Sequence, residues 1–224
     1  MEVLKLGIDD AGRGPVIGPM ILAGCLMNSK TEREFKKLGV KDSKQLTQKR
    51  REFLVKIIKE KSISFATALT SPTEIENKFN AGTKLNEVEA IKAAKIINKI
   101  NDGKRKIKVI VDCPSTSIVK WTDYLKTKID NLSNLEISCE HKADQNHACV
   151  SAASVLAKIL REKEMDKLRK KYGIEIGSGY PADPNTIKFL HKNIKKYEND
   201  GIFRKTWKTY KEAVLRSKQK KLKF

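Results

Sequence analysis

Runs of apolar and β-branched residues predict five strands along the chain. Residues 3–8 alternate roughly between apolar and less apolar positions, as a half-buried strand does. Residues 106–111 are rich in β-branched side chains, which is typical of a strand buried on both faces. Further strands are expected at 16–27, 62–69 and 135–138. The glycine-rich segment between the first two would join them as a hairpin.

Helical periodicity fills most of the intervals between these strands. In residues 86–100 the apolar side chains recur at the helical spacing. Thr47 is a good N-cap for a helix reaching residue 61, and Ser71 followed by Pro72 begins a short helix. Helices are also expected at 115–129, 146–171, 186–197 and 206–220.

This order of elements predicts an α/β fold. Three strands in hairpin order, followed by strand, helix, strand and helix, favour a mixed five-stranded sheet with helices on both faces. Residues 1–172 would form this main domain. Residues 173–224 would form a small C-terminal helical cap packed on it.

Four aspartates stand where predicted strands end or a helix begins. Asp9 and Asp10 follow the first strand, Asp112 ends the buried strand, and Asp144 precedes the long helix. Ligand sites in α/β proteins lie beyond the carboxyl ends of strands. Asp9 and Asp10 can share one site only if the chain leaves the strand at Asp10, because strand side chains alternate between faces. Taken singly, Asp112 and Asp144 could instead be helix N-caps.

If the four carboxylates converge, they require a cation. Two charges about 4 Å apart repel by roughly 4 kcal/mol at an effective dielectric constant of 20. An all-oxygen ligand set favours Mg²⁺ or Mn²⁺ over zinc, and two such ions support phosphodiester hydrolysis. Next to these acids, Gly12 and Gly14 allow close backbone approach, and Arg13 adds a cation.

The charge balance points to a polyanionic partner. Lysine and arginine total 47 against 27 acidic residues, a formal net charge of +20. Nucleic acid is the commonest partner of such a chain, although a lysine-rich, solvated surface is the alternative. The four cysteines and three histidines show no zinc-binding spacing. The longest apolar run is too short and too interrupted to cross a membrane, so a cytoplasmic protein is expected, and nothing demands more than a monomer.

Residues 7–19 carry a more specific signal. They read Gly7-Ile-Asp-Asp-Ala-Gly-Arg-Gly-Pro-Val-Ile-Gly-Pro19. This segment resembles the signature GxDEAGRGPxxGP of the type 2 ribonucleases H, departing from it at Asp10, where the family has glutamate. Further matches follow in the expected order: Lys41-Asp-Ser-Lys-Gln-Leu46, Asp112, His141-Lys-Ala-Asp144, Val150-Ser-Ala-Ala-Ser-Val-Leu-Ala-Lys158 and Gly177-Ser-Gly-Tyr-Pro-Ala-Asp-Pro184. Across nearly its whole length the chain is similar to the ribonuclease HII branch.

The resemblance implies a ribonuclease H-like fold and an activity. Such enzymes hydrolyse the RNA strand of RNA–DNA hybrids and cut 5′ to ribonucleotides embedded in duplex DNA, leaving a 3′-hydroxyl and a 5′-phosphate. By resemblance, Asp9 would bridge two Mg²⁺ or Mn²⁺ ions, and Asp10, Asp112 and Asp144 would complete the site. The shorter side chain of Asp10 leaves open a catalytically weak or silent nucleic-acid-binding protein of the same fold.

The resemblance also implies how substrate is bound. Gly12, Arg13 and Gly14 would approach the ribose 2′-hydroxyl, the group that distinguishes RNA from DNA. Tyr180 would stack on a sugar at the junction between a ribonucleotide and DNA, and a partly buried loop aromatic is its alternative. Candidates for contacting flanking phosphates are Ser43, Lys44 and Lys142, each of which could also be simply solvated.

The C-terminal residues suggest a second partner. Residues 219–224 read Gln219-Lys-Lys-Leu-Lys-Phe224, and sliding-clamp-binding peptides carry glutamine, an apolar residue three positions later, and then aromatics. Phe224 comes one position early, and no second aromatic follows it. Clamp binding through this tail therefore competes with a frayed basic helix end.

Overall fold

A mixed five-stranded sheet forms the centre of the protein, as the sequence predicts. The computed structural model describes residues 2–40 and 46–219. Within these residues the strand order is β3-β2-β1-β4-β5. β1 is antiparallel to β2 and parallel to β4, and β4 is parallel to β5. The strands are β1 (Leu4–Ala11), β2 (Met20–Met27), β3 (Ser64–Thr70), β4 (Ile107–Asp112) and β5 (Leu135–Glu140).

The helices begin largely where the local sequence predicts them. The Thr47 hydroxyl accepts a hydrogen bond from the Arg50 amide, and the Ser71 hydroxyl accepts one from the Glu74 amide. No helix in the described part of the chain is both long and apolar enough to span a membrane. The helices are α1 (Ser29–Lys37), α2 (Gln48–Lys61), α3 (Pro72–Asn80), α4 (Leu85–Ile100), α5 (Ile118–Lys126), α6 (Ala143–Asn146), α7 (Ala148–Tyr172), the 3₁₀ turn η1 (Ile174–Ile176), α8 (Pro184–Asn193) and α9 (Lys208–Gln219).

The chain divides into two compact units that are discontinuous in sequence. The first comprises the described parts of residues 1–11, 21–68 and 85–160. The second comprises the described parts of 12–20, 69–84 and 161–224. The second unit therefore contains segments that come long before residue 173. The division at residue 172 expected from the sequence stays a prediction.

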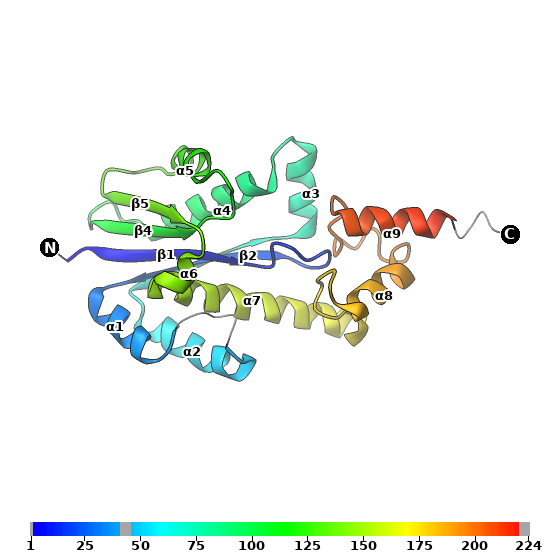
Figure 1. Cartoon of the computed structure of the whole chain (residues 1–224), viewed down its shortest axis with the longest axis horizontal. Helices are drawn as coiled ribbons and strands as arrows, with labels where there is room; N and C mark the ends of the chain where they lie inside the picture. Colours follow the sequence, from blue (N-terminus) through cyan, green and yellow to red (C-terminus); the bar gives the residue numbers. More distant parts are fainter. Residues whose placement is uncertain (1, 41–45, 220–224) are drawn as a thin grey trace. The chain divides into compact units, whose positions relative to one another are not determined.

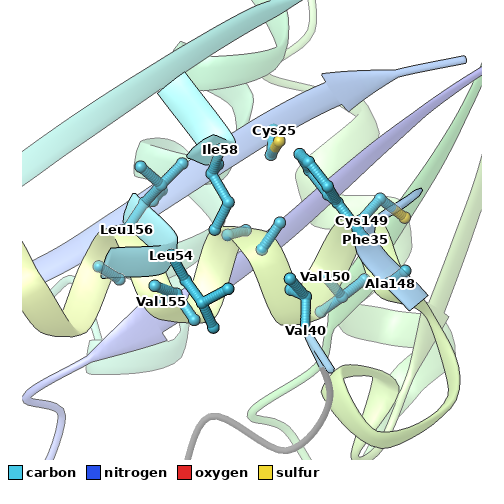
Figure 2. Close-up of a cluster of buried hydrophobic side chains, with 14 of the residues drawn as sticks. Cys25, Phe35, Val40, Leu54, Ile58, Ala148, Cys149, Val150, Val155 and Leu156 are labelled. Atoms are coloured by element: carbon cyan, nitrogen blue, oxygen red, sulfur yellow. The ribbon is translucent and has the colours of Figure 1, made fainter. Parts of the chain in front are cut away.

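In the first unit, helices cover both faces of the sheet (Figure 1). α4 and α5 lie on one face, and α1, α2 and the first half of α7 lie on the other. Figure 2 shows the core on this second face, where Phe35 of α1, Ile58 of α2 and Val150 of α7 meet. Cys149 belongs to this core, and burial raises the pKa of its thiol to about 12. Such a thiol behaves as a small apolar side chain.

The second unit has an apolar cluster of its own. Val16 and Ile17 pack with Phe189 of α8 and with Phe203 and Tyr210, which come from the end of the chain. Ile17 and Phe203 also form an isolated antiparallel bridge. Residues 16–19, expected to begin a strand, serve this unit instead, because Gly18 has φ of +88° and Pro19 follows it. The predicted strand 16–27 is therefore shortened to β2.

Two further expectations are corrected. The helix predicted at 146–171 begins only at Ala148, and the separate short helix α6 precedes it. β1 continues through Asp10 to Ala11, whereas the shared-site argument required the chain to leave the strand there. The extension exists because β2 still pairs with β1 at Asp9, Asp10 and Ala11, after β4 has stopped pairing at Ile8.

Gly7 brings β1 unusually close to the start of α7. A β-carbon built on Gly7 would lie 2.1 Å from the carbonyl carbon of Cys149 and 2.2 Å from the amide nitrogen of Val150. Both atoms belong to the helix backbone, so no rotamer change can make room. The absence of a side chain at Gly7 thus sets the distance between the strand that carries Asp9 and the helix α7.

We expect Gly7→Ala to lower the free energy of unfolding by about 3 kcal/mol or more, at or beyond the upper end of ordinary overpacking. Gly24→Ala is the matched strand control. Its β-carbon would meet the Cγ2 atom of Ile96 at 2.4 Å, and a side chain can shift. Urea unfolding of the two variants measures the difference. Equal losses would show that the helix backbone yields as easily as a side chain.

Candidate active site

Asp9 and Asp112 lie at the same end of two neighbouring parallel strands. The pairing of β1 with β4 ends at Ile8 and Val111, so these aspartates are the next residue on each strand. The sequence left open whether the two strands are neighbours, and the register confirms that they are. Parallel strands bring their carboxyl ends to one edge of the sheet, where α/β proteins bind ligands.

Asp9 is a buried acid in an unfavourable electrostatic environment. Its exposed fraction is 6%. Burial, and then the negative charges of Asp10 and Asp112, raise the pKa of its carboxyl well above the usual range. A hydrogen bond from the Ser154 hydroxyl of α7 opposes the shift, as does one from the Asp10 amide, whose nitrogen lies 2.7 Å from Asp9 Oδ1. Burial, reinforced by the nearby acids, therefore makes the charged form of Asp9 costly.

Asp10 and Asp112 are more accessible than Asp9. Both side chains are partly exposed. Each acts on Asp9 through its charge, so the structure brings these three acids within electrostatic reach of one another. Asp10 does so even though it lies within β1.

Asp112 is linked to the segment that carries Asp144. The amide of Ala143 donates to Asp112 Oδ1 at 3.1 Å, which ties the first turn of α6 to the end of β4. Asp144 is the next residue and is 1% exposed. The Ser151 hydroxyl of α7 donates to the Asp144 carbonyl oxygen at 2.6 Å. Neither Asp112 nor Asp144 is the helix N-cap that it could have been when considered singly. α5 begins after Ser117, and α7 begins at Ala148.

The connection from β5 to α6 is tightly held. Glu140 Oε2 lies 2.9 Å from His147 Nε2, and this hydrogen bond is the main cause that lowers the pKa of Glu140. His141 Nδ1 lies 3.0 Å from the Cys113 carbonyl oxygen. Lys142, the residue after His141, has φ of +56°, in the left-handed region. It is the one non-glycine residue with positive φ among those described. Such strain persists only where surrounding contacts enforce it.

The acids fit a hard divalent cation by their chemistry. All four are carboxylates, the ligands that Mg²⁺ and Mn²⁺ prefer. A cation would also offset the repulsion that raises the pKa of Asp9. Over the described residues, no three acidic, histidine or cysteine side chains already gather closely enough to form a metal-binding cluster.

In the second unit, the glycine–arginine–glycine turn of residues 12–14 is held by side chains from the end of the chain. Arg204 is fully buried and donates to the carbonyl oxygens of Gly12 and Arg13 at 2.6 and 2.8 Å. Trp207 Nε1 donates to the Gly14 carbonyl oxygen at 3.2 Å. Gly12 has φ of +85°, a backbone conformation that favours glycine.

Tyr180 belongs to the same unit as this turn. The residue is 38% exposed, and its Cε1 atom lies 3.8 Å from the position of a β-carbon built on Gly14. The Arg161 guanidinium stacks on the ring, with Cζ 4.7 Å from the ring centre. Arg161 also donates to the Ser178 carbonyl oxygen at 2.8 Å. A partly exposed aromatic thus stands beside an open glycine.

Sequence reasoning missed the residues that support these motifs. Ser154 lies in one of the matched motifs but was assigned no catalytic role there, and it donates a hydrogen bond to the Asp9 carboxylate. Arg161 and Trp207 lie inside predicted helices, and Arg204 lies between two of them, so none carries a local signal of its role. Lys142 is exposed. The candidates Ser43 and Lys44 lie outside the described residues.

Comparison with known proteins decides the family. The family model described as Ribonuclease HII matches residues 6–210. The chain belongs to the ribonuclease HII family. It is 40% identical to the ribonuclease HII of Methanocaldococcus jannaschii over 98% of this chain and 99% of that protein. Ribonuclease H2 from Pyrococcus horikoshii superposes with a TM-score of 0.86 and 35% identity, covering 97% of this chain and all of that one.

A second solved structure of the family is similar over slightly less of the chain. It is described as the complex of PCNA with ribonuclease HII from Archaeoglobus fulgidus. It has a TM-score of 0.80 and 35% identity, with coverage of 92% of this chain and 96% of that one. As a ribonuclease HII, the protein is a metal-dependent endoribonuclease that hydrolyses the RNA strand of RNA–DNA hybrids.

We expect Asp9→Asn to remove activity and yet to make the metal-free protein more stable. Loss of the buried charge relieves both desolvation and repulsion. Thermal unfolding in EDTA at neutral pH measures the gain, which we expect to lie in the usual range of a stabilising substitution, about 0.5–2 kcal/mol.

Asp102→Asn is the opposite control. Backbone amides of Lys104 and Arg105 lower the pKa of this exposed aspartate to about 2, so losing its charge should destabilise the fold and leave cleavage intact. A destabilised Asp9→Asn protein would show that the Asp9 carboxylate supports the fold.

Proposed function

We propose that Asp9, Asp10, Asp112 and Asp144 form the catalytic centre of this ribonuclease HII. The observation that supports this most directly is the burial of Asp9 beside two other acids at the end of parallel strands. Asp144 follows the residue whose amide holds Asp112, which supports its membership. Acids kept in so costly an arrangement are typical of functional sites.

The four carboxylates would hold two divalent ions, Mg²⁺ or Mn²⁺. When bound, such ions would supply Lewis acidity to activate water and to stabilise the leaving 3′ oxygen. The protein's own part is to orient the acids. Ser154 and the Asp10 amide orient the Asp9 carboxylate, and the Ala143 amide orients that of Asp112. No protein nucleophile is needed.

We propose that the second unit reads the ribose. The turn of residues 12–14 would approach the 2′-hydroxyl, and Tyr180 would stack on the sugar at a ribonucleotide–DNA junction. The open face of Gly14 beside the Tyr180 ring supports this. Lys142 would contact a flanking phosphate, as would Ser43 and Lys44 outside the described residues. The enzyme would then cut 5′ to a single embedded ribonucleotide, leaving a 3′-hydroxyl and a 5′-phosphate.

Cleavage of a labelled DNA duplex with one ribonucleotide, assayed with Mg²⁺, Mn²⁺ or EDTA, tests this function. We expect a metal-dependent cut on the 5′ side of the ribonucleotide and none in the all-DNA duplex. Asp10→Asn should lose most activity because it removes a charged ligand. Asp10→Glu should preserve activity because it keeps the carboxylate.

Three outcomes would contradict the proposal. Binding without a cut in either metal would remove the catalytic role. Full activity of Asp10→Asn would exclude Asp10 from the site, and an inactive Asp10→Glu protein would show that the site is built around the shorter side chain.

We also propose that residues 219–224 bind a sliding clamp. The sequence of this tail supports the proposal, as does the description of the Archaeoglobus fulgidus relative as a complex with PCNA. The residues after Gln219 lie outside those described. Action as a monomer stays a prediction.

We expect deletion of residues 219–224 to abolish binding to an archaeal clamp, measured by surface plasmon resonance, while hybrid cleavage without the clamp is unchanged. Exchanging Gln219 and Leu222 for alanine keeps the basic charge and should have the same effect. Binding that survives the exchange but not the deletion would indicate charge attraction only.

A further inference from the structure

We propose that Arg204 and Trp207 are positioning residues for ribose recognition. They would fix the orientation of the peptide groups in the turn of residues 12–14 and so raise the preference for a ribonucleotide over a deoxyribonucleotide. This inference rests on the proposed role of the turn and adds the residues that make the turn selective.

Arg204 is built into the second unit as a buried carbonyl-binding group. Its side chain is fully buried, although arginine is almost never buried without partners. Three of its nitrogens donate to backbone carbonyl oxygens: Nη2 to Gly12 at 2.6 Å, Nη1 to Arg13 at 2.8 Å and Nε to Gly18 at 3.0 Å. Lysine could not reproduce this fork, because its three donors sit on a single nitrogen and cannot reach three separate carbonyl oxygens in this geometry.

Trp207 completes the set of carbonyl contacts. Its indole Nε1 donates to the Gly14 carbonyl oxygen at 3.2 Å. The same ring lies under the Arg204 guanidinium, with Cζ 4.9 Å from the ring centre, and contacts Phe79 at 6.2 Å between ring centroids. The carbonyl groups of all three turn residues are therefore bound from one side.

This one-sided binding determines where the amide groups point. In a trans peptide the N–H is directed opposite to the C=O of the same plane, and no cis peptide occurs among the described residues. The Gly12 carbonyl shares its plane with the Arg13 amide, and the Arg13 carbonyl shares its plane with the Gly14 amide. Both amides therefore point away from Arg204. Two such neighbouring donors suit an oxygen ligand such as a ribose hydroxyl or its adjacent phosphate.

The chain offers a matched test of the indole contact. Its two tryptophans each donate from Nε1 to a backbone carbonyl oxygen, Trp207 to Gly14 and Trp121 of α5 to Asn86 at 2.8 Å. Phenylalanine keeps an aromatic ring and removes the N–H. Trp207→Phe therefore removes support from the turn, and Trp121→Phe removes an equivalent hydrogen bond in the first unit.

Binding constants would be measured with Ca²⁺ in place of Mg²⁺, for a short DNA duplex with one ribonucleotide and for its all-DNA counterpart. For Trp207→Phe we expect the ratio of the two constants to fall by about fivefold, the usual effect of one hydrogen bond. Affinity for all-DNA duplex should not change. Trp121→Phe should keep the wild-type ratio, and Arg204→Lys should lower it further if the variant folds.

Each outcome decides between a positioning and a merely structural role. Equal weakening of both duplexes by Trp207→Phe would overturn the proposal, because general loosening affects both ligands alike. An unchanged ratio, or an equal fall in Trp121→Phe, would also overturn it. If the wild-type protein bound both duplexes equally, the proposed ribose-reading role of the turn would itself be wrong. If the wild-type protein preferred the ribonucleotide and Trp207→Phe kept that preference, only the positioning role would be refuted.

Discussion

The close approach of β1 to α7 at Gly7 is the constraint on which the proposed catalytic centre depends. With the helix backbone against the strand, Ser154 reaches the carboxylate of Asp9. The same placement sets the turn before α7, where Ser151 holds the carbonyl of Asp144. A larger side chain in place of Gly7 would move strand and helix apart. The position of Asp9 thus depends on how closely the backbone of β1 packs against the backbone of α7 at Gly7.

The proposed catalytic acids contrast in charge with the rest of the chain. The protein has a net charge of +20, yet its centre collects carboxylates around a buried aspartate. Basic surface charge attracts the phosphate backbone and makes binding depend steeply on salt. In the proposed site the acids would need cations, and these cations would in turn bind the substrate phosphate. Basic surface residues would then attract the substrate, whereas acidic residues would assemble the site.

Much of this arrangement could be predicted from the sequence. The β-branched run of residues 106–111 identified β4 and placed Asp112 at its end. The sequence left open whether β4 lies beside β1, and the register shows that it does. The caps at Thr47 and Ser71 are local signals, and both helices begin there. Predictions succeeded where a few consecutive residues determine the result.

Other features could not be predicted because they depend on distant partners. β1 continues through Asp10 since β2 continues to pair with it, and a single strand does not reveal where its neighbour ends. The break between α6 and α7 depends on contacts of Asp112 and Glu140, which belong to other elements. Nothing near Arg204 indicates that its guanidinium binds carbonyl groups at the other end of the chain.

That long-range contact has a consequence for the order of folding. Arg204 follows Arg13 by 191 residues. Contacts so distant in sequence form late, after the loop between them has been closed. A chain still emerging from the ribosome can pair its first strands, but Arg204, which holds the turn of residues 12–14, has not yet been synthesised. The four aspartates are therefore synthesised before Arg204 and Trp207, so the proposed ribose-reading turn would gain its support only after the acids are present.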